Sequence, residues 1–239
     1  MLIPDKAILY AGDPMCSWCY GFSPALEQAM HEYEVPFIPV MGGLRPGANS
    51  EAMDDRLSRF LEHHWKQVER LTGRPFDYSI LSRRDFRYDT EPSCRAVVAV
   101  REMRTDLAFP FYFALQSAFY ARAENPTDEQ TFIRIAQELG IDADAFVQAY
   151  HSEENAYETK QDFQLCHALQ ITGFPALMYI ESRVAWPIAK GYRDLDDLRA
   201  AIDHTLKAAA ENAAEKREAN TVQNTGVTGE SCATDGSGC

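Results

Sequence analysis

Residues 6–21 read KAILYAGDPMCSWCYG, and this stretch decides how the chain begins to fold. The apolar run 7–10 is closed by Gly12, Asp13 and Pro14, a pattern that predicts a short buried strand. An apolar stripe at helical spacing follows and predicts an amphipathic helix: Phe22, Ala25, Leu26, Ala29, Met30 and Tyr33. The motif Cys16-Ser17-Trp18-Cys19 therefore lies between a strand and the start of a helix.

The position of Cys16 at a helix start gives its thiol a chemical role. Unpaired backbone N–H groups and the positive end of the helix dipole stabilise a thiolate there. Only the thiolate attacks a disulfide, and Cys19, one turn further along, lies close enough to resolve the mixed disulfide. We therefore predict a redox dithiol in which Cys16 attacks and Cys19 resolves.

A zinc knuckle and a chance spacing are the alternatives to a redox pair. Zinc would need a second pair at similar spacing. The remaining cysteines do not supply one: Cys94, Cys166, Cys232 and Cys239. Cys94 and Cys166 fall on apolar helical stripes, which favours small buried side chains. We expect no metal and no cofactor.

The rest of the chain completes a strand–helix–strand unit and adds a strand–strand–helix unit. Residues 35–41 (VPFIPVM) predict a second strand, whose two prolines favour a sheet edge. Residues 51–170 are mainly helical in pattern, and strands follow at 176–180 and 184–188 around the hairpin signal 181–183. This order predicts an α/β protein with a thioredoxin fold interrupted by helices. We expect three parts: a discontinuous thioredoxin-like domain (1–50 and 171–210), a helical insertion domain (51–170) and a flexible C-terminal tail (211–239).

A second signal is the segment 172–176 (TGFPA), directly before the third predicted strand. In a thioredoxin layout this loop lies against the cysteine pair. A cis bond between Phe174 and Pro175 would turn the Phe174 backbone toward a substrate strand. Because only about 5% of X–Pro bonds in folded proteins are cis, the sequence alone favours an ordinary trans proline at the head of a strand.

The composition restricts the partners. The chain of 239 residues carries 36 acidic and 23 basic residues, for a formal charge of −13. Such a surface repels phosphate backbones and anionic lipid, so we expect neither nucleic-acid nor membrane binding. Six cysteines are too sparse for a disulfide scaffold. The sequence begins without a basic segment followed by an apolar run, so we expect a cytoplasmic protein.

Four segments together resemble the DsbA family, and more narrowly its cytosolic FrnE-like branch of thiol–disulfide oxidoreductases. They are residues 13–21 (DPMCSWCYG), 42–47 (GGLRPG), 91–96 (EPSCRA) and 173–175 (GFP). The resemblance extends over about residues 5–205. It implies a thioredoxin fold with a helical domain, a nucleophilic Cys16, a resolving Cys19 and a cis peptide bond before Pro175.

The chain departs from DsbA itself between the two cysteines, where Ser17-Trp18 stands in place of Pro-His. Without that histidine the Cys16 thiol should be less acidic than in DsbA, and the nearby Asp13 acts in the same direction. A second departure is the signal peptide that the secreted relatives carry, which we do not find in this sequence. Both departures favour isomerase or reductase activity over a dedicated oxidase. The expected substrates are protein or peptide thiols and disulfides, with glutathione or thioredoxin as the electron partner.

Two competing functions remain. Glutathione-dependent isomerases of the 2-hydroxychromene-carboxylate type are similar in fold but replace the first cysteine by serine, so the intact pair argues against them. A non-enzymatic holdase chaperone would use the surface of the helical domain. Its activity would survive a Cys16→Ser change, whereas disulfide exchange would not.

The residues around the thiols suggest how a substrate binds. Trp18 and Phe174, with Tyr20 and Phe22, could form an apolar rim that binds unfolded peptide, although aromatic clusters are more often part of a core. We predict that Trp18, Phe174 and Pro175 bind substrate.

The segment from residue 219 to the end lacks aromatic residues and carries Cys232 and Cys239. We expect a second redox pair there, which a flexible tether would bring to the Cys16–Cys19 disulfide. Incidental cysteines, or zinc held by the same four sulfurs, are the alternatives.

Overall fold

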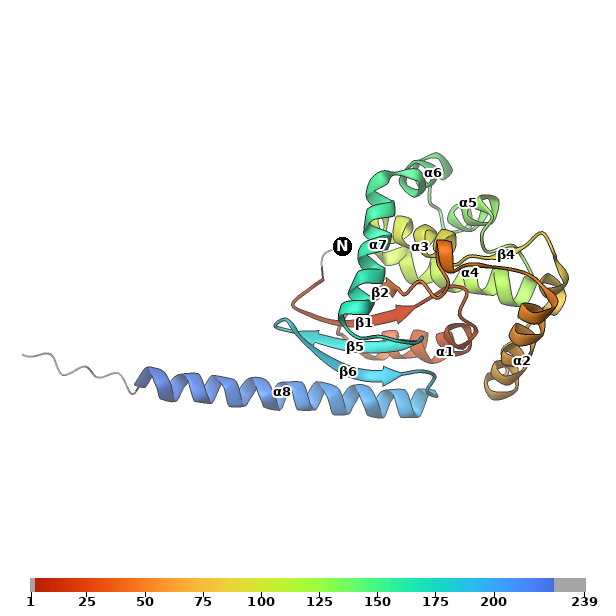
Figure 1. The fold of residues 1–239 in the computed structure, drawn as a ribbon. Coiled ribbons are helices and arrows are strands. Elements are labelled where there is room, and N and C mark those ends of the chain that lie inside the picture. The colour runs from red at the N-terminus through yellow and green to blue at the C-terminus, as the bar shows by residue number, and fades with distance from the viewer. Residues whose placement is uncertain (1–2, 226–239) are drawn as a thin grey trace, which may run out of the picture.

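In the computed structural model, which describes residues 3–225 and the side chains of residues 3–215, four strands form a mixed sheet (Figure 1). Their order is β2 (Phe37–Met41), β1 (Lys6–Gly12), β5 (Ala176–Glu181) and β6 (Val184–Lys190). β1 is parallel to β2 and antiparallel to β5, which is antiparallel to β6. The edge position predicted for β2 is confirmed, since an edge strand tolerates a Pro39 that lacks an N–H.

The hairpin predicted between β5 and β6 is also confirmed. Its turn residues Ser182 and Arg183 have φ angles of 51° and 65°. Positive φ at both central residues matches the twist of the flanking strands. The strand–helix order predicted from the sequence is therefore the observed one, and the thioredoxin fold with a helical insertion is confirmed.

Three helices cover the sheet: α1 (Ser17–Glu32), α7 (Glu153–Ala168) and α8 (Leu195–Thr225). Alternate side chains of β1 point to opposite faces. Ile8 belongs to the core that contains Phe22 of α1 and Leu198 of α8. Its neighbour Leu9 belongs to a separate core that contains Cys166 of α7. Both faces of the central strand are consequently buried.

Between β2 and α7 the chain forms the helical insertion. Its helices are α2 (Asp55–Thr72), α3 (Glu91–Met103), α4 (Ala108–Arg122), α5 (Glu129–Glu138) and α6 (Ala143–His151). It also contains two short paired strands, β3 (Glu51–Ala52) and β4 (Arg87–Tyr88), and three 3₁₀ segments at Gly47–Asn49, Tyr78–Ser82 and Thr105–Leu107. Asp54, Asp128 and Asp142 each accept a backbone N–H at the start of a helix, as helix caps do.

The helix α4 joins the insertion to the sheet. It is almost wholly apolar, and burial of most of its large side chains, including Phe111 and Phe119, confirms the buried helix predicted there. Phe111 lies in the same core as Ile8 and Phe22, whereas Phe119 lies in a second core around Trp65 of α2. The first of these cores contains residues of both the sheet and the insertion, so the two parts meet at an apolar contact instead of a polar boundary.

A buried ion pair also links the insertion to the sheet. Arg101 of α3 contacts Asp162 of α7 at 2.6 Å, and both side chains are almost fully buried. Arg101 also donates to the Pro39 carbonyl at 2.8 Å, and Asp162 accepts the Met41 amide at 2.8 Å. The pair thus attaches α3 and α7 to the edge strand β2.

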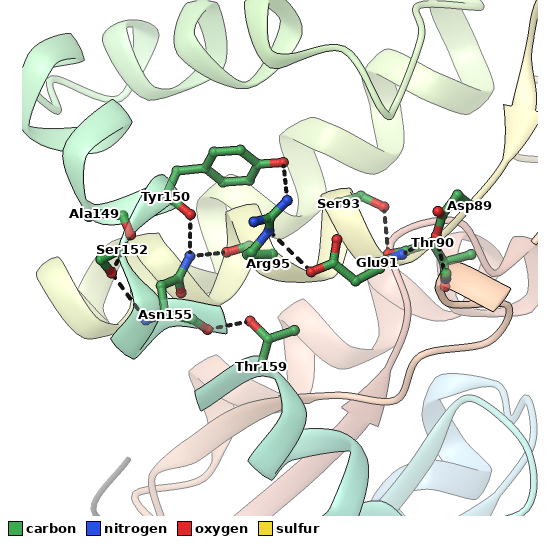
Figure 2. Close-up of polar contacts among 11 residues, drawn as sticks. Asp89, Thr90, Glu91, Ser93, Arg95, Ala149, Tyr150, Ser152, Asn155 and Thr159 are labelled. Carbon is green, nitrogen blue, oxygen red and sulfur yellow. Dashed lines mark hydrogen bonds and ion pairs between the residues drawn. The ribbon is translucent and has the colours of Figure 1, made fainter. Parts of the chain in front are cut away.

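A second polar network holds α3, α6 and α7 together (Figure 2). Arg95 pairs with Glu91 at 3.1 Å, and it donates to the Tyr150 hydroxyl at 3.3 Å. The Asn155 side chain donates to the Arg95 and Tyr150 carbonyls, both at 3.2 Å. These contacts lie within the insertion and α7 and contain no thiol.

Helix α8 is longer than the sequence suggested. It continues to Thr225, so residues 211–225, which we expected in the C-terminal tail, are helical. The segment 208–219 (AAAENAAEKREA) is composed almost entirely of strong helix formers, which explains the extension. Between residues 3 and 225, no helix is long and apolar enough to cross a membrane.

Candidate functional site

Cys16 and Cys19 lie at the N-terminus of α1, as predicted. Cys16 occupies the N-cap position in an extended conformation, and its carbonyl accepts the Tyr20 amide at 3.0 Å. Both thiols are free, and their exposed fractions are 5% for Cys16 and 0% for Cys19. Of the two, Cys16 is thus the one that reaches the surface, while Cys19 lies inside the core.

The loop before β5 faces Cys16. The Phe174–Pro175 peptide bond is cis, which confirms the geometry implied by the family resemblance. The Cys16 thiol donates to the Phe174 carbonyl at 3.6 Å. The Pro175 carbonyl accepts the Gly191 amide at 2.7 Å, which attaches the loop to the end of β6. Two segments 158 residues apart in sequence therefore meet at the thiol.

The Phe174 ring packs on Gly42, the first residue after β2. A Cβ atom at position 42 would overlap the ring, so only glycine allows this approach. The Gly42 amide donates to the Gly12 carbonyl at 2.7 Å. The segment 42–47 therefore supports the loop that faces Cys16.

Asp13 organises the turn between β1 and α1. Its carboxylate is fully buried and accepts the Met15 amide at 2.8 Å, the Leu44 amide at 2.6 Å and the Cys94 thiol at 3.5 Å. Burial raises the pKa of Asp13, and these hydrogen bonds oppose that shift. Asp13 thereby joins α3 and the 42–47 segment to the residues just before Cys16.

The pKa of the Cys16 thiol is raised well above its ordinary value. The main cause is the side-chain hydrogen bond with Cys19, followed by burial; the Asp13 charge adds a smaller contribution. The backbone N–H of Cys19 opposes the rise in this pKa, as expected at a helix N-terminus. The predicted influence of Asp13 has the expected sign but is a minor one.

A buried polar strip from α4 lies beneath the cysteine pair. Ser23, one turn after Cys19 on α1, donates to the Cys19 carbonyl at 3.0 Å and to the Gln116 side chain at 2.5 Å. Tyr112, one turn before Gln116, contacts the Tyr10 hydroxyl at 3.0 Å and donates to the Asp13 carbonyl at 3.2 Å. The insertion thus supplies side chains to the thiol site.

The predicted aromatic rim is only partly present. Trp18 and Phe174 are half-buried near the surface, and the Trp18 ring lies 5.9 Å from that of Tyr192. Tyr20 and Phe22, in contrast, are fully buried, and Tyr20 stacks on Tyr120 at 4.8 Å. The rim expectation is therefore wrong for Tyr20 and Phe22, because both side chains point from α1 into cores.

A cavity of about 510 Å³ opens beside the loop that carries Phe174. Its walls come from the end of α7, the loop and residues of β5 and β6. Met178 and Pro187 give it an apolar floor, with Gln170 and Lys190 among the polar residues that line it. The cavity is large enough to receive side chains of a bound peptide.

The other predicted residues fall into two groups. Cys94 and Cys166 are buried, as expected from their apolar stripes. Cys232 and Cys239 lie outside the described residues. Among the residues that are described, no group of three or more His, Cys, Asp or Glu side chains could hold a metal ion.

Sequence reasoning missed Tyr10, Tyr112 and Gly42. A signal for the two tyrosines exists, since each places a hydroxyl within an otherwise apolar, buried segment that offers it no partner of its own. Gly42 belongs to the 42–47 segment, but its contact with Phe174 joins positions far apart in the chain and has no local signature.

Comparison with known proteins agrees with this arrangement. The family model described as DSBA-like thioredoxin domain matches residues 12–203. A crystal structure of a candidate protein disulfide isomerase from Nitrosomonas europaea is 33% identical; the match covers 86% of this chain and 99% of that chain with a TM-score of 0.80. The cytosolic disulfide reductase DsbM from Pseudomonas aeruginosa, also solved with GSH, shares the fold at 22% identity and a TM-score of 0.71, over 84% of this chain and 99% of that chain.

A curated relative is the ClpXP adapter protein SpxH of Halalkalibacterium halodurans. It is 24% identical over 178 residues, which cover 72% of this chain. The match spans only 58% of the length of SpxH. The match of the family model over most of the sequence decides the assignment: the chain belongs to the family of the DSBA-like thioredoxin domain.

Proposed function

We propose that this protein is a thiol–disulfide oxidoreductase that reduces or isomerises protein disulfides through Cys16 and Cys19. The observation that carries the proposal is the placement of the Cys16 thiol. It lies at the N-terminus of α1, 3.6 Å from the Phe174 carbonyl, with Cys19 one turn behind it. A nucleophilic thiol, a resolving thiol and a backbone segment that can hold a substrate chain therefore meet at one point.

In the proposed reaction the Cys16 thiolate attacks a substrate disulfide. One substrate sulfur leaves as a thiol, and the other forms a mixed disulfide with Cys16. Cys19 then attacks the Cys16 sulfur, which forms the Cys16–Cys19 disulfide and releases the second substrate thiol. Isomerisation results when another substrate thiol attacks the mixed disulfide before Cys19 does.

The direction of the reaction follows from the environment of the thiols. A raised pKa of Cys16 leaves its thiolate without the stabilisation that makes a dithiol a strong oxidant. This supports reductase or isomerase activity. The cytoplasmic location that we propose is supported by the similarity to DsbM, a cytosolic disulfide reductase. Because DsbM is a cytosolic disulfide reductase solved with GSH, glutathione is the first electron partner to test and thioredoxin the second.

The loop and the cavity supply the proposed substrate site. Thr172 and Gly173 are exposed, and a bound strand can pair with their backbone beside Cys16. Trp18, Phe174 and Pro175 would contact that strand. Its side chains would enter the cavity, whose apolar floor suits segments exposed in an incompletely folded protein.

The deciding experiment measures insulin reduction and the reactivation of scrambled ribonuclease, together with the reduction potential of the Cys16–Cys19 couple. We expect both activities in the wild type, their loss in Cys16→Ser, and their retention in the matched control Cys166→Ala. A glutathione regenerating system and a thioredoxin regenerating system are compared as electron sources. If Cys16→Ser retains either activity, Cys16 is not the nucleophile and the proposal fails.

A further inference from the structure

The most unusual polar feature near the thiols is a hydroxyl pair in the core. Tyr10 of β1 and Tyr112 of α4 are both fully buried, and their hydroxyl oxygens are 3.0 Å apart. The Tyr10 ring stacks on Phe22, one turn after Cys19 on α1. Burial raises the pKa of the Tyr10 hydroxyl, and the charge of Cys19 and a side-chain hydrogen bond with it act in the same direction. The Tyr112 hydroxyl donates to the Asp13 carbonyl at 3.2 Å. A continuous chain of polar groups therefore runs from Cys19 through two hydroxyls to a backbone carbonyl.

The absence of a side chain at Gly12 leaves room for the Tyr10 hydroxyl. Gly12 follows two positions later on the same face of β1, and a Cβ atom there would lie 2.7 Å from that hydroxyl oxygen. This is closer than real Cβ atoms approach, so any larger residue at position 12 would displace the hydroxyl. The ring itself is held by Phe22 at 6.3 Å and by Phe109 at 6.0 Å between centroids. The fold therefore fixes the place of the Tyr10 hydroxyl.

Cys19 needs such a partner because it reacts while buried. In the resolution step its sulfur must carry negative charge as it attacks Cys16. With 0% of its surface exposed, no bulk water reaches it to solvate that charge. A buried charge without a hydrogen-bond partner is strongly unfavourable.

We propose that the Tyr10–Tyr112 pair is a reversible hydrogen-bond relay that serves Cys19 in both of its protonation states. With Cys19 as a thiol, its S–H points to the Tyr10 oxygen, Tyr10 donates to Tyr112, and Tyr112 donates to the Asp13 carbonyl. With Cys19 as a thiolate, the Tyr10 O–H rotates to the sulfur, and the Tyr112 O–H turns to the Tyr10 oxygen. Hydroxyl groups make this exchange by rotation alone, since each is both donor and acceptor.

The relay removes no proton from Tyr10 or Tyr112. During resolution the bond between the Cys16 and substrate sulfurs breaks and the bond between Cys16 and Cys19 forms. The dithiol is oxidised, the substrate sulfur is reduced, and the proton lost by Cys19 ends on the departing substrate thiol. Burial raises the pKa of both tyrosines well above the ordinary value, so each hydroxyl keeps its proton and remains a donor. The other ionisable groups that face this site are Cys16 and, through it, Asp13.

This inference rests on the proposed function, and the test separates the two. Reduced protein is mixed with dithiodipyridine, which releases one pyridinethione when Cys16 attacks and a second when Cys19 resolves. The first phase depends on probe concentration, whereas the second is unimolecular. Tyr10→Phe keeps the ring and removes only the hydroxyl. Tyr150→Phe is the matched control, since it removes another buried hydroxyl, one that is bonded to Arg95 instead of to a group at the thiol site (Figure 2).

We expect Tyr10→Phe to slow the second phase about tenfold to a hundredfold, the effect of one hydrogen bond to a charged group. The pH at which this phase accelerates should move upward, which a merely structural change would not cause. Tyr112→Phe leaves the Tyr10 hydroxyl in place and should slow the second phase less, and Tyr150→Phe should not change it.

Cooperative thermal unfolding checks that each variant is folded, and Tyr112→Phe tests the relay independently if Tyr10→Phe is not. A second phase within about twofold of the wild type, with an unmoved pH profile, in whichever of these two variants folds would overturn the relay. A wild type without two phases would instead contradict the proposed function.

Discussion

The cysteine pair at the N-terminus of α1 and the two cysteines outside it, Cys94 and Cys166, are equally buried but differ in their surroundings. The exposed fractions are 5% and 0% in the first pair and 0% and 3% in the second. Cys94 lies in the first turn of α3 and donates to Asp13, and Cys166 lies near the end of α7, 3.8 Å from the Met41 carbonyl. Neither Cys94 nor Cys166 has a second cysteine one helical turn away in the sequence.

Burial therefore does not separate reactive from structural cysteines in this protein. What separates them is a second thiol one turn away and a loop that can hold a substrate chain, since Cys94 also lies in the first turn of a helix. Burial raises the pKa of Cys166 to about 12, and no group that favours its thiolate acts on it. The pKa of Cys16 is also raised, but mainly through the second thiol, Cys19, which takes part in the proposed reaction.

The capture of substrate should distinguish the two groups most strongly. Cys19→Ala should accumulate mixed disulfides between Cys16 and substrate proteins, because the attacking thiol remains and the resolving thiol is gone. Cys16→Ala should accumulate none, and Cys166→Ala should behave as the wild type. Non-reducing gel electrophoresis after incubation with scrambled ribonuclease, which supplies the disulfides, measures the adducts. Adducts on Cys94 or Cys166 would remove the distinction between the two groups.

Alkylation rates compare the same thiols without a substrate. With iodoacetamide at neutral pH, Cys16 should react first, because it reaches the surface at the helix N-terminus. Cys94 and Cys166 need a local opening, and an opening that costs about 3 kcal/mol would make them on the order of a hundredfold slower. Mass spectrometry of quenched samples locates the label. Earlier labelling of Cys19 than of Cys16 would reverse the roles assigned to the pair.

The contribution of the loop is tested by Gly42→Ala. The added Cβ would overlap the Phe174 ring and force the loop away from Cys16. We expect about tenfold lower insulin reduction and a loss of about 1–3 kcal/mol in the free energy of unfolding, the usual penalty of overpacking. Gly73→Ala, at the end of α2, is a control for lost stability alone, since a Cβ there meets no neighbour but the φ of 69° strains alanine. If Gly42→Ala is fully active, the loop position does not matter for Cys16.

At neutral pH the smallest expected effect is the one from Cys166, because its pH dependence appears only above pH 9. Its pKa rises from 9.0 to about 12 on folding, so the folded protein keeps a proton that the unfolded chain loses. This stability contribution is fully present below pH 9 and is lost as the pH rises toward 12. The unfolding free energy of the wild type minus that of Cys166→Ala should therefore fall by about 1.4 kcal/mol per pH unit in that range. Urea unfolding at several pH values measures it, and a constant difference would contradict the burial effect.

The sequence predicted those features whose cause is local. The apolar run of β1 and the stripe of α1 placed Cys16 and Cys19 at a helix start, and the two prolines placed β2 at the sheet edge. Burial of Cys94 and Cys166 followed from their apolar stripes. The cis bond before Pro175 followed only from the family resemblance, because local preference favours trans.

The order of elements and the place of the dithiol are thus readable from the chain alone, since hydrophobic periodicity and helix-start chemistry act over a few residues. The residues that surround the thiols depend instead on tertiary packing. Tyr10 contacts Tyr112, which lies 102 positions later in the sequence. Phe174 contacts Gly42, although the whole insertion separates the two residues in the sequence. Tyr20 and Phe22 belong to cores instead of a binding rim, because the packing of α1 against α2 and α4 fixes which way its side chains point. Such contacts depend on how whole elements pack in three dimensions, and no short stretch of sequence specifies that packing.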